Sequence, residues 1–153
     1  MSRYTAVVEW TLKDGEDFPR GRYSRGHTLS FDGGVTLAGS SSPHVVPRPW
    51  SVEAAVDPEE LLVAALSNCH MMTFLHEARL AHHLVTAYRD EAEGVMAKNA
   101  EGRMAITRVT LRPRIAFARD APDAAALAAL HHRAHEGCFI ANSVKTEVVV
   151  EPV

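Results

Sequence analysis

Residues 57–69 decide how this chain folds, because they define its first long helix and place a cysteine in it. They read Asp-Pro-Glu-Glu-Leu-Leu-Val-Ala-Ala-Leu-Ser-Asn-Cys. Asp57 is a favourable N-cap, Pro58 suits the first helical position, and Glu60 has capping-box spacing. We therefore predict a helix from Asp57 to about His82. The residues expected on its inner face recur at helical spacing: Leu62, Ala65, Leu66, Cys69, Met72 and His76.

The second cysteine, Cys138, follows Gly137 at the end of a second, Ala-rich helix. This helix is expected to begin near Asp120-Ala121-Pro122-Asp123 and to run to about Glu136. Because the N-terminus lacks the apolar core of a signal peptide, we expect a cytoplasmic protein. A static disulfide is unusual in that compartment, so two cysteines on separate helices indicate thiol chemistry. The apolar stripe predicted for the second helix is Leu127, Leu130 and Ala134.

Strands are expected on both sides of the first helix. Alternating apolar residues, a hairpin signal at Asp32-Gly33-Gly34 and a turn at 99–102 mark most of them. The resulting order is β-β-β-α-β-β-α-β, which is typical of an α+β fold rather than a doubly wound one. The predicted strands span residues 4–12, 27–31, 35–38, 87–96, 103–117 and 145–151.

Length and composition limit the function classes. A chain of 153 residues is long enough for one domain with its own core, which we place over residues 1–153. The net charge is -3 and the basic residues are scattered, so no nucleic-acid partner is expected. No apolar run approaches the roughly 20 residues that span a bilayer, so no membrane partner is expected. The apolar helices and strand faces exceed what one chain can cover, which suggests a dimer.

Several segments together resemble the OsmC/Ohr family of osmotically inducible and organic hydroperoxide resistance proteins. Pro58-Glu59-Glu60-Leu61-Leu62, Ala64-Ala65 and Ser67-Asn68-Cys69-His70 look like its central-helix signature. The resemblance covers nearly the whole chain in order and spacing. Three further segments of the family, its hairpin, its long strand and its second cysteine segment, also have counterparts in this chain. They are Asp32-Gly33-Gly34, Arg108-Val109-Thr110-Leu111 and Cys138-Phe139-Ile140-Ala141-Asn142-Ser143-Val144.

The resemblance implies a fold and a chemistry. The fold is an intertwined α+β homodimer with two long central helices, antiparallel sheets and active sites at the subunit interface. The chemistry is thiol-dependent reduction of organic hydroperoxides, with no cofactor and with an external dithiol as reductant. Carried over by position, Cys69 is the peroxidatic thiol, Cys138 the resolving thiol and Glu59 the family's carboxylate. Arg25 is our choice for the partnering arginine, and Arg20 and Arg22 are its rivals.

The positions of Cys69 and Glu59 along the predicted helix constrain these roles. Cys69 lies about 18 Å from the helix start, too far for the helix dipole to lower its pKa, so a cation is needed. Ten residues of straight helix separate Glu59 from Cys69 by about 15 Å and turn it about 80° off the same face. If both act, we expect them to meet across a dimer interface.

Each residue also has a purely structural interpretation. Cys69 can be a small buried apolar side chain, and Glu59 a first-turn carboxylate that favours the helix dipole. The segment after Cys138 departs from the commoner family pattern. In that pattern a proline soon follows the second cysteine, whereas this chain has Phe139-Ile140-Ala141 there. Cys138 can therefore be a spectator in the pocket wall.

The nine histidines raise the question of a metal. His131 and His135 are four residues apart on the second helix, and His70 and His76 flank the turn of Cys69. No carboxylate or Cys-x-x-Cys motif completes a convincing ligand set, so no metal is expected. The alternative to a peroxidase is a non-enzymatic dimer of the same fold that binds a small hydrophobic ligand or a metal.

Overall fold

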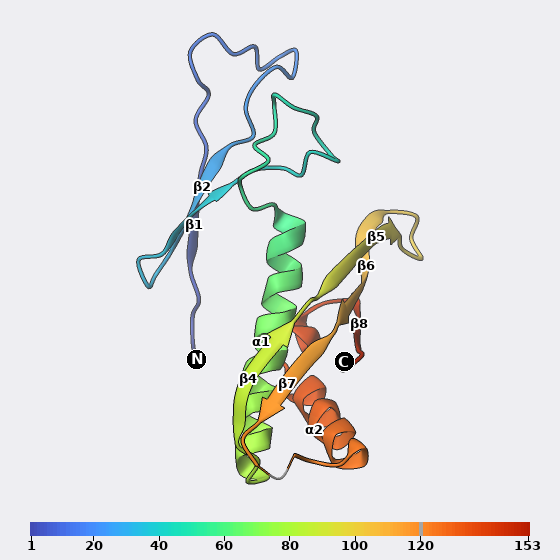
Figure 1. Cartoon of the computed structure of the whole chain (residues 1–153). Coiled ribbons are helices and arrows are strands. Elements are labelled where there is room, and N and C mark those ends of the chain that lie inside the picture. The colour runs from blue at the N-terminus through green and yellow to red at the C-terminus, as the bar shows by residue number, and fades with distance from the viewer. Residues whose placement is uncertain (120) are drawn as a thin grey trace. The chain divides into compact units, whose positions relative to one another are not determined.

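The computed structural model describes residues 1–119 and 121–153 (Figure 1). Asp120, where the second helix was expected to begin, lies outside the described residues. The described residues form two compact units, Met1–Leu61 and Leu62–Val153, and each is treated by itself below. One domain over all 153 residues remains a prediction.

The first unit contains a three-stranded antiparallel sheet in the order β1-β2-β3. Its strands are β1 (Ala6–Glu9), β2 (His27–Phe31) and β3 (Thr36–Gly39). The predicted hairpin is confirmed: Gly34 has φ 83°, and its N–H donates to the Phe31 carbonyl oxygen at 3.0 Å. Strand β1 is shorter than the predicted 4–12, and all four of its residues are exposed.

Helix α1 (Pro58–Leu80) begins where the sequence predicts, and its first turn lies in the first unit. The capping box is present: the Glu60 N–H donates to Asp57 Oδ1 at 2.7 Å and the Asp57 N–H to Glu60 Oε2 at 3.0 Å. At the other end His82 has φ 61°, and the His83 N–H donates to the Ala78 carbonyl oxygen at 2.9 Å. This left-handed turn ends the helix shortly before the predicted position.

Five strands follow α1 in the second unit. They are β4 (Val85–Asp90), β5 (Glu93–Lys98), β6 (Met104–Leu111), β7 (Pro113–Phe117) and β8 (Glu147–Val150). Strands β4 and β7 form an antiparallel pair, and β5, β6 and β8 form a second sheet. The predicted antiparallel arrangement is wrong for the last strand, because β8 pairs with β6 in parallel.

The two long strands predicted at 87–96 and 103–117 are each broken into two, which corrects the expected element order. The Arg112 N–H donates to the Asp90 carboxylate at 2.6 Å instead of joining a strand ladder. Pro113, which has no N–H, follows at once. Both strands therefore break at the same level, and the order is β-β-β-α-β-β-β-β-α-β.

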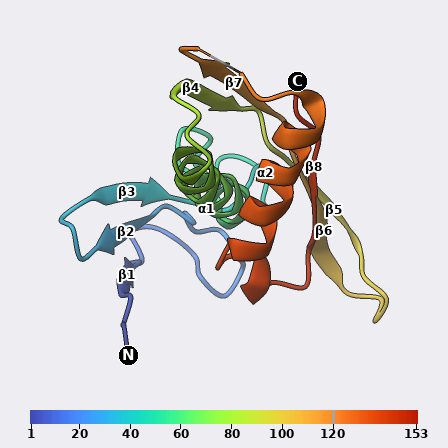
Figure 2. The same cartoon turned by 90° about the horizontal axis from the view of Figure 1, so that it is seen from below.

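Helix α2 (Ala124–Gly137) lies alongside α1 in the second unit (Figure 2). Asp123 caps it, since its Oδ1 accepts the Ala126 N–H at 2.8 Å. The predicted stripe of α2 is confirmed, but that of α1 is partly wrong: Met72 and His76 are exposed. The buried residues of α1 are Leu66, Cys69, His70, Phe74 and Ala78.

Two apolar clusters hold the second unit together. In the first, Phe74 and Ala78 of α1 meet Leu130 and Ala134 of α2, and side chains of β4 and β7 cover them. In the second, Leu66 of α1 meets residues of β6. Within the described residues, no helix combines the length and apolar character needed to cross a membrane.

Candidate functional site

The two cysteines meet inside the second unit. Cys69 lies in α1 and Cys138 is the C-cap of α2, and both are free thiols. Their side chains are joined by a hydrogen bond. Cys69 is 8% exposed and Cys138 is 1% exposed. The expected juxtaposition of the two thiols is therefore present within a single chain.

The segment after α2 holds Cys138 in place. The Ala141 N–H, at the start of the short 3-10 helix η1 (Ala141–Ser143), donates to Cys138 Sγ at 3.4 Å. The Asn142 amide donates to the Glu136 carbonyl oxygen at 2.9 Å, so the turn closes back onto α2. Phe139, next to the buried cysteine, is 79% exposed.

This environment makes the two thiols unequal. Burial raises the pKa of the Cys138 thiol above its ordinary value, and its interaction with Cys69 raises it further. The Ala141 N–H acts in the opposite direction, because it favours the thiolate of Cys138. The net result is a pKa above the ordinary value, so the Cys138 thiol keeps its proton at neutral pH.

The close approach of α2 to α1 near the thiols depends on a glycine. A Cβ on Gly137 would lie 3.1 Å from the Thr73 methyl group. Thr73 is one turn beyond Cys69, whose carbonyl oxygen accepts the Thr73 hydroxyl at 2.9 Å. Farther along, Arg133 of α2 pairs with Glu77 of α1 at 2.8 Å.

Two buried histidines also join the helices. His70 Nε2 of α1 and His131 Nδ1 of α2 are 3.1 Å apart, and the residues are 1% and 4% exposed. Burial lowers the pKa of both imidazoles to about 4, so both are neutral at pH 7. Phe74 stacks on His131 with ring centroids 4.5 Å apart.

Within the described residues, the remaining ring nitrogens of this histidine pair have no hydrogen-bond partner. His70 Nδ1 and His131 Nε2 are buried without a hydrogen bond, as is Nδ1 of the nearby His135. In the part of the chain that the structure describes, no three His, Cys, Asp or Glu side chains are grouped to hold a metal ion. The sequence suggested His131 and His135 as a pair, but the pairing partner of His131 is His70. The sequence does carry a sign that His70 is buried. It shares a four-residue spacing with the apolar residues Leu66, Phe74 and Ala78, which places it on the inner face of α1.

Arg25 lies in the first unit and is held in place by its neighbours. Its guanidinium donates to the main-chain carbonyl oxygens of Gly21 and Tyr23, and its Cζ lies 3.7 Å from the centroid of the Tyr23 ring. The rival Arg20 is exposed and pairs with Asp17 at 3.6 Å, and Arg22 is exposed. Of the three arginines, only Arg25 is half-buried and preorganised.

Glu59 is the second site residue in the first unit. Its Oε2 is buried and has no hydrogen-bond partner in residues 1–119 and 121–153. Among the described residues, no ion pair or hydrogen bond joins Glu59 to Arg25. A buried, unpartnered carboxylate oxygen calls for an explanation, because leaving one unpaired costs on the order of 1–3 kcal/mol.

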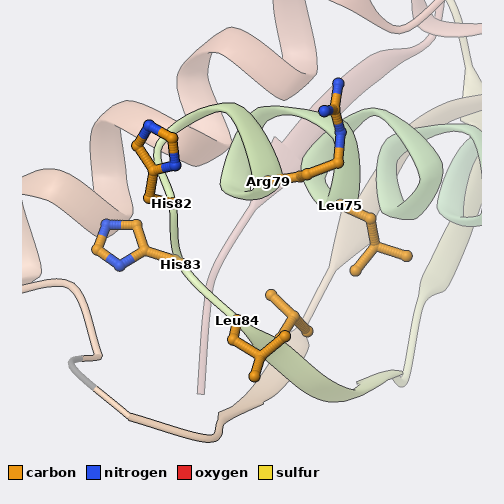
Figure 3. Close-up of a pocket in the computed structure, with 6 residues that line it drawn as sticks. Leu75, Arg79, His82, His83 and Leu84 are labelled. Carbon is orange, nitrogen blue, oxygen red and sulfur yellow. The ribbon is translucent and has the colours of Figure 1, made fainter.

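A pocket lies in the second unit, at the C-terminal end of α1 (Figure 3). Its volume is about 310 Å³. Figure 3 shows the side chains of Leu75 and Leu84 on one side and the imidazoles of His82 and His83 on the other. Neither cysteine lines it. The lining residues are Leu75, Arg79, His82, His83, Leu84 and Val85.

Comparison with known proteins identifies the family. The sequence profile of the OsmC-like proteins matches residues 51–153, so the chain belongs to the OsmC-like family. It is 52% identical to an OsmC-like protein of unknown function from Vibrio cholerae, whose structure gives a TM-score of 0.97 with 100% of both chains covered. No curated protein matches the chain.

Two more distant relatives share the fold. An organic hydroperoxide resistance protein from Elizabethkingia anophelis is 15% identical, with a TM-score of 0.71 over 99% of this chain and 94% of that one. The organic hydroperoxide resistance protein OhrB of Bacillus subtilis is 21% identical, with a TM-score of 0.66 over 97% of this chain and 98% of that one. The predicted α+β, OsmC-like fold is therefore confirmed.

Proposed function

We propose that this protein is a thiol-dependent peroxidase that reduces organic hydroperoxides to alcohols. The observation that carries the proposal is the hydrogen bond between the buried thiols of Cys69 and Cys138. Two free thiols in direct contact can exchange two electrons with a substrate and close a disulfide without a large movement of the chain. The relatives named as organic hydroperoxide resistance proteins share this fold.

The contact also favours an order of events. Because the raised pKa of Cys138 keeps that thiol protonated, we assign Cys69 as the thiol that attacks the peroxide. The Cys69 thiolate attacks the terminal, hydroxyl-bearing oxygen of the hydroperoxide. A sulfur–oxygen bond forms, the oxygen–oxygen bond breaks, and the alkoxide takes up a proton and leaves as the alcohol. Cys69 becomes a sulfenic acid.

Cys138 then resolves the sulfenic acid. Its sulfur attacks the Cys69 sulfur, the hydroxyl group leaves as water, and a Cys69–Cys138 disulfide forms. An external dithiol, of the lipoyl type or another, restores both thiols by two exchange steps and is itself oxidised to a disulfide. The cycle requires no cofactor. It fits a reducing compartment, and we place the protein in the cytoplasm.

We assign Arg25 as the cation that holds the Cys69 thiolate and orients the peroxide, and Glu59 as the carboxylate that orients the arginine. Arg25 is preorganised by Tyr23 and two carbonyl oxygens. Glu59 has a buried oxygen without a partner in the described chain. A partner supplied by a second copy of the chain would satisfy it, which supports a homodimer with shared sites.

Exposed apolar side chains also support the homodimer. In the first unit, Val7 and Val8 of β1 are 54% and 64% exposed; in the second, Met72 of α1 is 56% exposed. A homodimer interface that covers these side chains would remove their apolar surface from water. Met72 and Leu75 of α1 also offer apolar surface for the alkyl or aryl group of an organic hydroperoxide, which favours such substrates over hydrogen peroxide.

Turnover with a defined peroxide and a defined reductant tests the proposal. Cumene hydroperoxide and dihydrolipoamide are supplied to the wild-type protein, Cys69→Ser and Cys138→Ser, and peroxide loss is followed. The wild type should turn over many equivalents, Cys69→Ser none, and Cys138→Ser should slow and then stop as Cys69 over-oxidises. Equal rates in the wild type and Cys69→Ser would exclude a Cys69-based peroxidase.

The pocket at the end of α1 favours a second candidate, binding of a small amphipathic anion. Leu75 and Leu84 offer apolar contact, and Arg79 forms no ion pair within the described residues. An anionic head group on an alkyl chain fits both features. Calorimetric titration of the wild type and Arg79→Gln with decanoate tests it: saturable binding that weakens in the variant supports this role, and no binding excludes it. The histidines offer no comparable support for a metal.

A further inference from the structure

The histidine pair lies where the two helices that carry the thiols meet. His70 is the residue after Cys69 in α1, and His131 precedes Cys138 by seven residues, or two turns, in α2. Residues seven apart lie on nearly the same face of a helix. The bond between His70 Nε2 and His131 Nδ1 therefore holds the face of α2 on which Cys138 also lies. It attaches this face to α1 at the residue next to Cys69.

We propose that His70 and His131 are positioning residues for the thiol pair: their mutual hydrogen bond holds the end of α2 against α1 so that the Cys138 sulfur meets Cys69. The inference extends the proposed function, since a disulfide cycle requires this contact. It does not depend on peroxide as the oxidant, because the contact between the thiols exists in the resting protein.

The bond depends on the charge of the imidazoles. Two neutral rings share one N–H between His70 Nε2 and His131 Nδ1. One added proton keeps an N–H···N bond but places a charge beside Phe74 and Leu130. A second proton makes both facing nitrogens N–H donors, so the hydrogen bond is lost. Acid should therefore loosen the contact between α1 and α2, which separates the thiols.

Other ionisable groups around the pair modify this response. His135, on α2, also faces His70 and disfavours a charge there. Asp90 of β4 favours a charge on His131 but already accepts hydrogen bonds from Ser67 and from the Arg112 N–H. Burial raises the pKa of Tyr88, also of β4, so that it stays neutral. Despite these neighbouring groups, burial remains the largest effect on the pKa of both imidazoles.

Three variants separate bonding from titration. His131→Asn keeps a short polar group for His70 but does not titrate. His131→Phe fills similar volume without a hydrogen bond. His132→Gln is the matched control, because His132 is adjacent in sequence, largely exposed and paired only with Glu136 on the surface. All three alter α2 at or next to one position and leave both cysteines in place.

The readout is disulfide formation driven by diamide, an azo oxidant. The Cys69 and Cys138 thiols lose two electrons and two protons as the sulfur–sulfur bond forms, and the azo bond takes them up to become a hydrazine. Rates are measured from pH 7.5 to pH 3.5, across the pKa of about 4 of both imidazoles, by intact mass, with helix content followed by circular dichroism. The reaction needs no peroxide, so it still tests the positioning role if the protein proves not to be a peroxidase.

At pH 7.5 we expect His132→Gln and His131→Asn within about twofold of the wild-type rate, and His131→Phe slower by about tenfold or more. As the pH falls below 4, the ratio of the His131→Asn rate to the wild-type rate should rise several-fold, because only the wild type can protonate both imidazoles and set two N–H donors against each other. A wild-type rate in His131→Phe, or a ratio that does not change with pH, overturns the proposal. If His131→Phe does not fold, the pH dependence of His131→Asn decides alone.

Discussion

The Cys138 thiol is hydrogen-bonded to the Cys69 sulfur at the point where the end of α2 reaches α1. Both thiols are buried and free, and burial raises the pKa of Cys138 above its ordinary value. This relationship links the OsmC-like fold to the proposed chemistry. The side chains around the two thiols can be substituted one at a time, and each substitution has its own expected effect on activity or stability.

Removing the proposed cation should slow oxidation of Cys69 without unfolding the protein. We expect Arg25→Met and Glu59→Gln each to lower the rate of Cys69 oxidation by cumene hydroperoxide by about tenfold to a hundredfold, since less thiolate forms and the peroxide is less well oriented. Single-turnover loss of free thiol is the measurement. Arg20→Gln is the control, because Arg20 is exposed and pairs only with Asp17. Unchanged rates in Arg25→Met and Glu59→Gln would remove both residues from the site.

Acid should destabilise the second unit through its buried histidines. The pKa of His70 and of His131 is lowered from 6.5 to about 4. Between pH 6.5 and pH 4 the unfolded chain binds protons that the folded one does not, so stability is full above pH 6.5 and falls toward pH 4. We expect a loss on the order of 2–3 kcal/mol per imidazole, not fully additive because the two interact. Urea unfolding at pH 7 and pH 4.5 measures it.

The control for this acid effect is the pair of variants at positions 131 and 132. His131→Asn should show a smaller loss of stability between the two pH values, because one titrating group is gone. His132→Gln should match the wild type, since the His132 side chain is exposed. Equal losses in all three proteins would mean that the buried histidines do not govern acid stability.

Gly94 of β5 should not tolerate a side chain. A Cβ there would lie 2.6 Å from Val63 Cγ2 of α1, well inside van der Waals contact. We expect Gly94→Ala to lower the free energy of unfolding by about 1–3 kcal/mol. Val63→Ala in the same chain should recover part of that loss. Gly33→Ala is the control, because nothing lies within 4 Å of its Cβ position. A neutral Gly94→Ala would show that β5 can move away from α1.

The end of α1 can be stabilised. His82 holds a left-handed conformation, with φ 61°, at the position after the helix where glycine is usual. We expect His82→Gly to raise the free energy of unfolding by about 0.5–1 kcal/mol, and His82→Val to lower it. Thermal unfolding of the two variants gives the comparison. The opposite order would mean that contacts of the imidazole in the pocket outweigh the backbone strain.

Local signals predicted the helices and hairpins well. The capping box at Asp57, the Asp-Gly-Gly turn and the turn beginning at Asn99 depend on neighbouring residues alone, and all three are present. The contact between the thiols was implied by the family resemblance rather than by spacing. It is then explained by Gly137, which lets α2 approach Thr73.

Features set by distant contacts were predicted less well. The breaks at Arg112 and near Asp90 arise from a hydrogen bond between two strands, which no local pattern records. The parallel pairing of β8 with β6 likewise depends on where α2 returns the chain. His70 and His131 are separated by 61 positions, so their bond emerges only when α1 packs against α2.

The most direct test is a single turnover followed by intact mass. Reduced protein is treated with one equivalent of cumene hydroperoxide, and free thiols and mass are determined for the wild type and Cys138→Ser. We expect loss of both thiols and of two hydrogens in the wild type, and gain of one oxygen on Cys69 in the variant. Survival of both thiols in the wild type, with its mass unchanged, would contradict the peroxidase assignment.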